Sequence, residues 1–261
     1  MQVLTPNLDF AGFLARLARA SSRVLLLDYD GTLAPFHPDP ARAVPYAGVT
    51  PLLREVIAAG TRVVLVTGRP AEQLPPLVGL DPAPEIWGSH GWERRLPDGR
   101  LERAMPSDEE RAALERAATL ASDALQRGAR LERKLASVAL HWRGVPADER
   151  AACEAAIRAA WSAHRGLGAL QLLGFDGGLE LRAPGCNKQH AVKAVLAATP
   201  ADAAIAYLGD DLTDEDAFAA VRSRGIALLV RPGFRPTAAD VWLQPPAELL
   251  DFLSYWRGRE A

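Results

Sequence analysis

The sequence predicts an α/β fold with a doubly wound, mostly parallel sheet, and two patterns carry this prediction. Short apolar runs end just before small, hydroxyl or charged residues, at Val24–Leu27, Val63–Val66, Ala203–Leu208 and Ile226–Val230. Continuous apolar strands are typical of a parallel sheet that helices cover on both faces. Helical patterns lie between these runs, at Val49–Ala59, Glu72–Leu77, Lys188–Ala198 and Glu215–Arg222. This alternation predicts right-handed crossovers and a ligand site beyond the carboxyl ends of the strands.

The middle of the chain has a different pattern and predicts a small inserted α+β domain. Alanine-rich amphipathic helices are expected at residues 107–127 and 147–164. Short strands of mixed character are expected at residues 130–134, 137–142, 169–173 and 179–182. Pro97-Asp98-Gly99 and Ala183-Pro184-Gly185 are rich in turn formers and suit hinges. We therefore expect a core made of residues 1–94 and 185–261 and a cap, or lid, made of residues 95–184.

Composition places the chain among ordinary globular proteins. Of its 261 residues, 49% are hydrophobic and 24% are charged, and the mean hydropathy is -0.03. Lys and Arg number 30 and Asp and Glu number 32, which gives a net charge of -2. A near-neutral chain gives no electrostatic reason to expect a nucleic-acid partner. No apolar stretch is long enough to span a bilayer, so no membrane partner is expected.

The cysteines and the N-terminal segment predict a cytoplasmic protein. Cys153 and Cys186 are too few for a disulfide framework and lack the spacing of a metal cluster. We expect both to be ordinary thiols of a reducing compartment. The first twenty residues include Asp9 and lack a basic start followed by a long apolar run. This segment therefore predicts an amphipathic helix rather than a signal peptide.

The first acidic cluster follows the apolar run that ends at Leu27. Asp28 and Asp30 stand two residues apart, so they share a face of an extended chain, and Gly31 allows a sharp turn. Two close carboxylates repel each other, and Mg²⁺, which prefers oxygen ligands, would offset that repulsion. A carboxylate can also act as a nucleophile that forms an aspartyl phosphate. By itself the segment also fits a strand that ends in a plain Asp-Gly turn.

A second acidic cluster follows the apolar run that ends at Leu208. Thr213 and Asp216 fit a capping box, and acidic residues suit the first turn of a helix. That interpretation does not account for Asp210 and Asp211, which precede the cap. A solvated acidic loop is one interpretation of these two residues, and a metal site is the other.

The metal interpretation joins the two clusters, because both follow strands of the same predicted sheet. Asp210 can complete a metal site with Asp28 and the backbone carbonyl of Asp30. Asp214 can join this site or orient a water molecule within it. The two acidic clusters at strand ends favour this interpretation over a solvated loop.

Two weaker segments supply groups that can bind an anion. Thr67 and Gly68 follow another apolar run, and a hydroxyl with backbone N–H groups at a helix start is a typical anion site. Lys188 begins a predicted helix, where a positive charge opposes the helix dipole. An anionic ligand would offset that cost. The alternatives are a plain helix start and an ordinary surface lysine.

These motifs, in their order along the chain, resemble the trehalose-6-phosphate phosphatase family of the haloacid dehalogenase superfamily. The resemblance covers nearly the whole chain beyond Arg23. It rests on Asp28-Tyr-Asp30-Gly-Thr-Leu, Thr67-Gly-Arg69, Lys188 and Gly209-Asp210-Asp211-Leu-Thr-Asp214-Glu-Asp-Ala-Phe. Further likeness lies in Gly88-Ser-His-Gly91, Glu180-Leu-Arg182, and Lys134, Ser137, His141 and Arg143. The family implies a Rossmann-like core with an inserted cap, as the element pattern also predicts.

The resemblance implies roles for the core residues. Asp28 would be the nucleophile, and Asp30 would be the general acid and then the general base. The metal would be Mg²⁺, held by Asp28, the Asp30 carbonyl and Asp210, with Asp214 as a further candidate ligand. The transferring phosphoryl group would be bound by Thr67, Gly68 and Lys188.

The resemblance also implies a substrate and a cap that recognises it. Trehalose 6-phosphate would be hydrolysed to trehalose and phosphate, and a separate trehalose-phosphate synthase is the expected partner in the pathway. Glu132, Lys134 and Glu180 are the residues expected to contact the sugar. This sequence departs from the family pattern at three positions. Thr67 stands where Ser is common, Ala183 where Pro is common, and Gln189 where Gly is common.

Three other functions remain open at this point. The same chemistry on another sugar phosphate, such as sucrose phosphate or a glycosyl phosphoglycerate, would differ only in the cap. A phospho-acceptor signalling module also combines acidic residues, a hydroxyl and a lysine, but such modules are shorter and need no cap. A sugar-binding protein that has lost catalysis is disfavoured, because all the expected catalytic residues are present.

Overall fold

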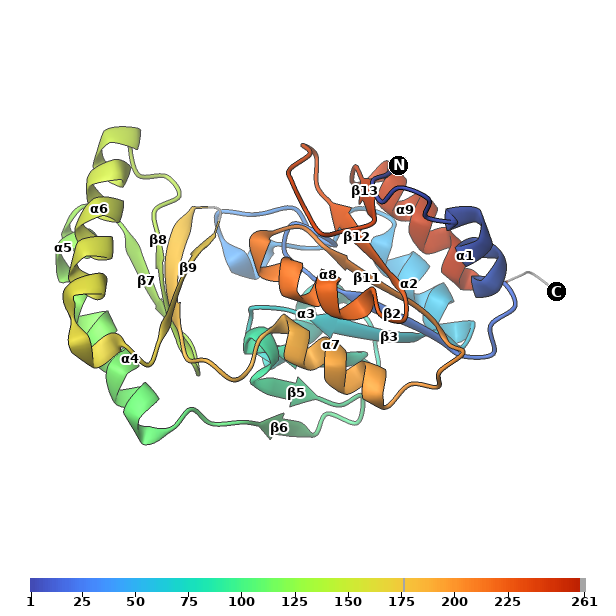
Figure 1. Ribbon diagram of the computed structural model, residues 1–261, viewed down its shortest axis with the longest axis horizontal. Helices are drawn as coiled ribbons and strands as arrows, with labels where there is room; N and C mark the ends of the chain where they lie inside the picture. The colour runs from blue at the N-terminus through green and yellow to red at the C-terminus, as the bar shows by residue number, and fades with distance from the viewer. Residues whose placement is uncertain (176, 259–261) are drawn as a thin grey trace. The chain divides into compact units, whose positions relative to one another are not determined.

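The computed structural model describes residues 1–175 and 177–258, which divide into two compact units (Figure 1). The core unit consists of Met1–Glu102 and the chain from Asn187 onward, and the inserted unit is Arg103–Cys186. The expected first boundary, at residue 95, falls earlier than this division. Residues 95–102 belong with the core unit because β5 (Glu93–Arg95) and β6 (Leu101–Arg103) extend its sheet.

The core unit is built on a nine-stranded sheet within the described residues, in the order β1-β13-β12-β11-β2-β3-β4-β5-β6. The six strands from β13 to β4 are parallel, whereas β1 and β5 pair antiparallel with their neighbours. The bounds of the remaining strands are β1 Gln2–Val3, β2 Arg23–Leu27, β3 Arg62–Val66, β4 Glu85–Gly88, β11 Ala204–Gly209, β12 Ile226–Val230 and β13 Val241–Leu243.

The strand order reverses at β2, and this reversal positions the site. From β2 the chain proceeds through β3 and β4 toward one edge, whereas β11, β12 and β13 proceed toward the other edge. Strands β2 and β11 lie side by side, with Leu27 opposite Leu208. In doubly wound sheets, the crevice beyond the strand ends at such a reversal is where ligands bind. The residues that follow β2 and β11 therefore lie at the expected position for a site.

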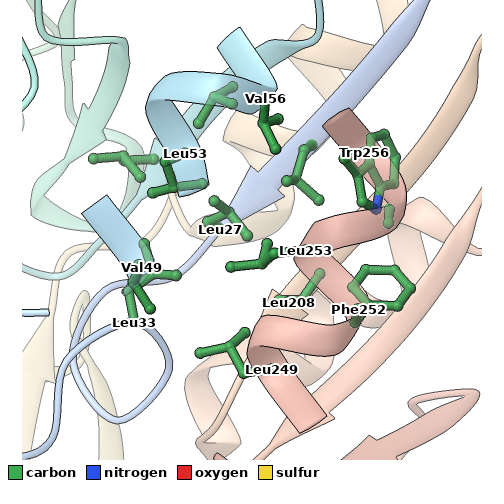
Figure 2. Packing of buried hydrophobic residues seen from close by; sticks show 14 of the residues in the cluster. Leu27, Leu33, Val49, Leu53, Val56, Leu208, Leu249, Phe252, Leu253 and Trp256 are labelled. Atoms are coloured by element: carbon green, nitrogen blue, oxygen red, sulfur yellow. The ribbon is translucent and has the colours of Figure 1, made fainter. Parts of the chain in front are cut away.

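Helices cover both faces of this sheet, as a doubly wound fold requires. One face packs against α1 Phe10–Leu17, α2 Val49–Ala58, α3 Pro75–Val78 and α9 Ala247–Ser254. The opposite face packs against α7 Lys188–Ala197 and α8 Glu215–Val221. Figure 2 shows the hydrophobic core on the face that α2 and α9 cover, where Leu53 of α2 and Leu253 of α9 lie beside Leu27 of β2. This close packing holds the ends of the central strands in fixed positions.

The strands predicted in the core unit and the N-terminal helix are confirmed, although that helix is shorter than the segment in which it was expected, and one other helix prediction was wrong in detail. The helix expected at Glu72–Leu77 is a 3₁₀ turn, Ala71–Gln73, followed by the one-turn helix α3. Pro75 and Pro76 have no backbone N–H, so they can begin a helix but cannot continue one from the preceding turn. The N-terminal helix is confined to α1, and β1 precedes it as an edge strand paired with β13.

The inserted unit is a four-stranded antiparallel sheet within the described residues, in the order β7-β8-β10-β9. One face packs against the helices through residues such as Leu140, Leu179 and Leu181. Because side chains alternate along a strand, neighbouring polar residues lie on the other face. The element bounds are α4 Asp108–Leu120, α5 Ser122–Gln126, β7 Arg130–Arg133, β8 Ser137–His141, α6 Ala147–Ala163, β9 Gln171–Phe175 and β10 Gly178–Arg182.

Two details of the inserted unit differ from expectation. The helix predicted at residues 107–127 is divided at Ala121 into α4 and α5, and Ser107 caps α4 in a capping box with Glu110. The third strand begins at Gln171, two residues later than predicted, because a 3₁₀ turn at Arg165–Leu167 precedes it. Among the described residues, no helix has both the length and the apolar character needed to cross a membrane.

Candidate active site

Asp28 lies at the reversal of the strand order, directly after β2. Its backbone N–H donates to the carbonyl of Leu208 at 2.8 Å, which continues the pairing with β11. The residue is only 3% exposed. The Thr32 hydroxyl donates to Oδ2 at 3.2 Å, and the Lys188 ammonium donates to Oδ1 at 2.7 Å. The carboxylate is therefore buried and fixed by two donors.

Lys188 joins this carboxylate to the second acidic cluster. Its Nζ also donates to Oδ1 of Asp214 at 2.7 Å, and the lysine is 3% exposed. Burial alone would lower the pKa of Lys188, but the charges of Asp214 and Asp28 raise it above its usual value. The helix begins at Lys188 despite the unfavourable dipole, because Asn187 caps it by accepting from the backbone N–H of His190. The lysine is thus a charged group held between two acids.

Asp214 is fully buried, and four protein groups donate hydrogen bonds to its carboxylate. Its Oδ1 accepts from Lys188 and from the Tyr207 hydroxyl at 2.6 Å. Its Oδ2 accepts from the backbone N–H groups of Asp210 and Asp211 at 3.2 and 3.1 Å. Each oxygen of the carboxylate thus accepts from two donors. These contacts link Asp214 to Lys188, and the direct ligation of a metal by Asp214 stays a prediction.

The cap of this loop also differs from the expected one. A capping box forms between Asp211 and Asp214, which closes the 3₁₀ turn Leu212–Asp214 ahead of α8. The predicted pairing of Thr213 with Asp216 was wrong, because α8 begins directly after that turn, at Glu215. The turn directs Asp214 back toward the sheet and leaves Asp210 at the end of β11.

Three carboxylates gather here in a way that fits a metal ion. Asp28, Asp210 and Asp214 each offer an oxygen within 4.8 Å of the other two, and all three are buried. Burial raises the pKa of Asp28 to about 7; Lys188 opposes this change and Asp214 adds to it. Burial, together with the charges of Asp28 and Asp214, raises the pKa of Asp210 well above its usual value. A divalent cation would relieve this repulsion, and an oxygen-only donor set suits Mg²⁺.

Gly31 leaves the space in which Asp210 lies. The glycine has a φ of +84°, which is unfavourable for other residues. A Cβ placed there would stand 2.0 Å from Oδ2 of Asp210. The close approach of the loop after β2 to the end of β11 therefore depends on this glycine.

Asp30 is held by an arginine from the segment that follows the neighbouring strand, β3. Arg69 donates from Nε to Oδ2 and from Nη2 to Oδ1 of Asp30, both at 2.6 Å. This two-point geometry is the strong form of an arginine–carboxylate pair. The sequence motif contained Arg69, but its pairing with Asp30 was not predicted.

Thr67 and Gly68 follow β3, on the other side of β2 from β11. The Thr67 hydroxyl accepts from the backbone N–H of Arg69 at 3.2 Å, so the segment closes into a tight turn. A Cβ on Gly68 would stand 2.6 Å from Nε2 of His90, so a larger residue here would have to displace the His90 ring. The turn follows β3, which pairs in parallel with β2, so it lies at the same edge of the sheet as Asp28, where an anion site is expected.

An unusual backbone segment supports this turn. Ser89 and His90 adopt left-handed φ values of 51° and 57°. Their N–H groups donate to the carbonyls of Arg69 and Thr67 at 2.7 and 2.9 Å. Left-handed conformations in residues other than glycine cost free energy and cluster at functional sites. The sequence motif Gly88-Ser-His-Gly91 contained this signal, but the backbone geometry was not predicted.

The residues expected to contact a sugar gather on the polar face of the inserted sheet. Lys134 Nζ lies 3.2 Å from Glu180 Oε1 and 3.9 Å from Glu132 Oε2. The Ser137 hydroxyl donates to Glu180 at 2.6 Å, and His141 Nε2 lies 2.7 Å from Glu132. Burial would raise the pKa of Glu132, but His141 and Lys134 outweigh this and lower it to about 2. The structure therefore brings the three predicted residues together within one unit.

Residues 26–241 match the model of a family described as trehalose-phosphatase. The chain belongs to the trehalose-phosphatase family. The family resemblance expected from the motifs is thereby confirmed. A trehalose-phosphate phosphatase of Mycobacterium marinum is 35% identical over 240 residues, covering 87% of this chain and 60% of the relative. The chain thus spans about three-fifths of the length of that curated relative.

Solved structures confirm the fold of this trehalose-phosphatase family member. The C-terminal domain of a trehalose-6-phosphate phosphatase of C. albicans aligns with a TM-score of 0.84 and 21% identity, covering 98% of this chain and 99% of that one. A haloacid dehalogenase-like hydrolase from B. subtilis aligns with a TM-score of 0.61 and 14% identity, covering 88% and 98%. The predicted α/β fold of the haloacid dehalogenase type is therefore confirmed.

Proposed function

We propose that this chain is a Mg²⁺-dependent phosphatase that hydrolyses trehalose 6-phosphate to trehalose and inorganic phosphate. The observation that carries the proposal is the buried arrangement of Asp28, Lys188 and Asp214 beside Asp210, at the reversal of the strand order. A buried aspartate that lies beside an ammonium and a second carboxylate is suited to accept a phosphoryl group. Family membership supports the same reaction.

Phosphoryl transfer would begin at Asp28. One carboxylate oxygen attacks phosphorus while the bond between phosphorus and the sugar oxygen breaks. Asp30 gives its proton to the departing sugar oxygen, and an aspartyl phosphate remains on Asp28. Water then attacks phosphorus and passes a proton to Asp30. The Asp28–phosphorus bond breaks, and inorganic phosphate leaves.

The surrounding residues would bind the charge that this reaction develops. Asp28, Asp210 and the backbone carbonyl of Asp30 would hold Mg²⁺, which when bound offsets the repulsion between a carboxylate and a phosphate dianion. Lys188, with the hydroxyl of Thr67 and the N–H of Gly68, would hold the phosphoryl oxygens. Asp214 would act through Lys188, because it fixes the ammonium from the side opposite Asp28.

The inserted unit is proposed as the cap that recognises the sugar. Glu132, Lys134 and Glu180 present both acceptors and donors on one sheet face. Such a set suits a disaccharide with many hydroxyls, since a site built to hydrogen-bond those groups rejects ligands that lack them. The names of the relatives favour trehalose 6-phosphate. Other sugar phosphates, including sucrose phosphate and a glycosyl phosphoglycerate, are the alternative substrates.

We further propose a cytoplasmic location and a separate synthase that makes the substrate. The two cysteines within the described residues, Cys153 and Cys186, are free and buried, which fits a reducing compartment. The proposed reaction needs a source of the sugar phosphate, and a trehalose-phosphate synthase is the class of enzyme that supplies it.

The test is a phosphate-release screen with Mg²⁺ across disaccharide and monosaccharide phosphates, ranked by kcat/KM. We expect trehalose 6-phosphate to rank first and Asp28→Asn to release no phosphate while its far-ultraviolet circular dichroism is unchanged. Comparable kcat/KM values on many monosaccharide phosphates would overturn the substrate assignment. A phosphorylated Asp28 that persists without turnover would instead favour the signalling module.

A further inference from the structure

The pair formed by Asp30 and Arg69 has a role beyond a surface ion pair. Both oxygens of Asp30 accept from Arg69 at 2.6 Å, and the side chains are 27% and 11% exposed. Arg69 comes from the segment after β3, which carries Thr67 and Gly68, whereas Asp30 comes from the segment after β2, which carries Asp28. The pair therefore connects the two segments on which the proposed phosphoryl transfer depends.

Arg69 is itself held at several points, so it can restrain what it binds. Its Nη1 donates to the carbonyl of Pro40 at 2.7 Å, and its guanidinium lies 5.5 Å from the centre of the Tyr29 ring. Its backbone N–H donates to the Thr67 hydroxyl, and its carbonyl accepts from Ser89 at 2.7 Å. A side chain anchored in this way loses little additional freedom when it binds a carboxylate.

A second arginine near β3 forms an ion pair that serves for comparison with the pair of Asp30 and Arg69. Arg62, at the start of β3, pairs with Glu85 at 2.7 Å. That pair lies at the amino end of β3, away from the strand ends that carry the acidic residues. Arg69 lies beyond the carboxyl end and contacts the residue that would give and accept the proton. The two arginines thus offer a matched pair for experiments.

We infer that Arg69 is the positioning residue of Asp30. It fixes the orientation of the Asp30 carboxylate relative to the phosphate-binding turn, so that the acid and base steps start from one geometry. The inference rests on the proposed function, because it takes Asp30 as the general acid and base. Arg69 acts through Asp30 and transfers no proton itself.

The first test is a double-mutant cycle on kcat/KM, with Arg69→Lys, Arg69→Gln, Asp30→Asn and the double variant Asp30→Asn/Arg69→Gln. We expect Arg69→Gln to lower kcat/KM about 10–100-fold, since small misplacements of a catalytic group cost this much. Arg69→Lys should retain more activity, because it keeps the charge but not the two-point contact. The double variant should be no worse than Asp30→Asn alone. Additive losses, or no loss in Arg69→Gln, would overturn the inference.

The second test varies the leaving group. An aryl phosphate such as p-nitrophenyl phosphate departs without needing a proton, whereas a sugar does need one. If Arg69 acts by positioning Asp30 as the general acid, Arg69→Gln should lose less kcat/KM on the aryl phosphate than on the sugar phosphate. Equal losses on both would mean that Arg69 binds the phosphate instead. Arg62→Lys is the matched control, and we expect it to leave both values unchanged.

A third measurement does not depend on turnover and so separates this inference from the proposed function. NMR of the metal-free protein should show that the Nε–H proton of Arg69 exchanges slowly with solvent. The signal of this proton is assigned by its absence from the spectrum of Arg69→Lys. The slow exchange should be lost in Asp30→Asn and kept in Arg62→Lys. Fast exchange in the unchanged protein would overturn the pairing. If no sugar phosphate is hydrolysed, the proposed function fails while this result still decides whether the pair exists.

Discussion

Lys188 Nζ lies 2.7 Å from Oδ1 of Asp28 and 2.7 Å from Oδ1 of Asp214, so one ammonium joins the two buried carboxylates. Asp28 follows β2 and Asp214 follows β11, whereas Lys188 begins α7. Three distant parts of the chain therefore meet at one ion cluster. Removal of one charge from such a cluster leaves an uncompensated buried charge, which is costly.

Lys188→Met should unfold more easily and lose phosphate release. The change leaves two close carboxylates without their cation, and loss of one partner of a buried pair costs about 3–5 kcal/mol. The loss of unfolding free energy should be smaller at pH 5.5 than at pH 8. The raised pKa of Asp28 allows this carboxylate to take up a proton at the lower pH, which removes the repulsion. Urea unfolding at the two pH values measures this. Lys193→Met, an exposed position on the same helix, is the control and should change little. An equal loss in both variants would contradict the role of the cluster.

Asp214→Asn and Asp210→Asn should have opposite effects on the stability of the metal-free protein. Asp214 accepts from four protein donors, so its amide variant loses contacts to Lys188 and should lower the melting temperature. Asp210→Asn removes a carboxylate whose pKa is raised by burial and by Asp28, so it should raise the melting temperature in chelator. Thermal unfolding with EDTA and with Mg²⁺ distinguishes the two.

Added Mg²⁺ completes that comparison. We expect it to stabilise the unchanged protein and Asp214→Asn, because a ligand that binds only the folded state raises its stability. It should have little effect on Asp210→Asn, which lacks a proposed ligand. Equal stabilisation of Asp210→Asn by Mg²⁺ would remove Asp210 from the metal site.

Mg²⁺ binding should weaken as the pH falls below about 7. Burial raises the pKa of Asp28 in the folded, metal-free protein to about 7, from a usual value of 3.8. The folded state therefore holds an extra proton between these values, so this group contributes stability at low pH that is lost as the pH rises through about 7. Mg²⁺ binds the ionised carboxylate, so a proton must leave Asp28 when the metal binds. This competition weakens the affinity for Mg²⁺ about tenfold for each unit by which the pH falls below about 7.

Calorimetry tests this linkage directly. Titration of Mg²⁺ at pH 6 in two buffers of different ionisation enthalpy gives the number of protons released. We expect proton release at pH 6 and much less at pH 8.5. The same titration with Asp28→Asn should release fewer protons at pH 6. An affinity that is independent of pH from 5.5 to 8.5 would contradict a protonated Asp28.

The strand ends that carry the site could be predicted from sequence because each has a local signal. Apolar runs that end before Asp28 and Asp210 predict buried parallel strands and a shared edge. The partners of those residues could not be predicted in the same way. Tyr207 occupies an apolar run, and only the fold brings its hydroxyl to Asp214. Arg69 reaches Asp30 across 39 positions of sequence, a distance that no periodic pattern reports.

The two edge strands of the core sheet were also hard to predict, for a related reason. Strand β1 has two residues and both are exposed, so it lacks the apolar run that identified the central strands. Strand β6, Leu101–Arg103, is similarly short and charged. Edge strands gain their conformation from pairing with a neighbour and need little burial of their own. Residues 95–102 were therefore expected in the cap, with a hinge at Pro97-Asp98-Gly99, although pairing places them with the core unit.

Glu132→Gln should raise KM for trehalose 6-phosphate and leave kcat nearly unchanged. Glu132 lies 2.7 Å from His141, and its pKa is lowered to about 2, so it is ionised at every pH used for assay. The amide is a weaker acceptor for sugar hydroxyls, and loss of a contact made equally in the ground and transition states raises KM alone. The matched control is Glu115→Gln, because Glu115 forms an exposed ion pair with Arg133 on α4 and β7. Steady-state kinetics of the two variants should differ in KM only. A fall in kcat with an unchanged KM would mean that Glu132 acts in the chemical step rather than in sugar binding.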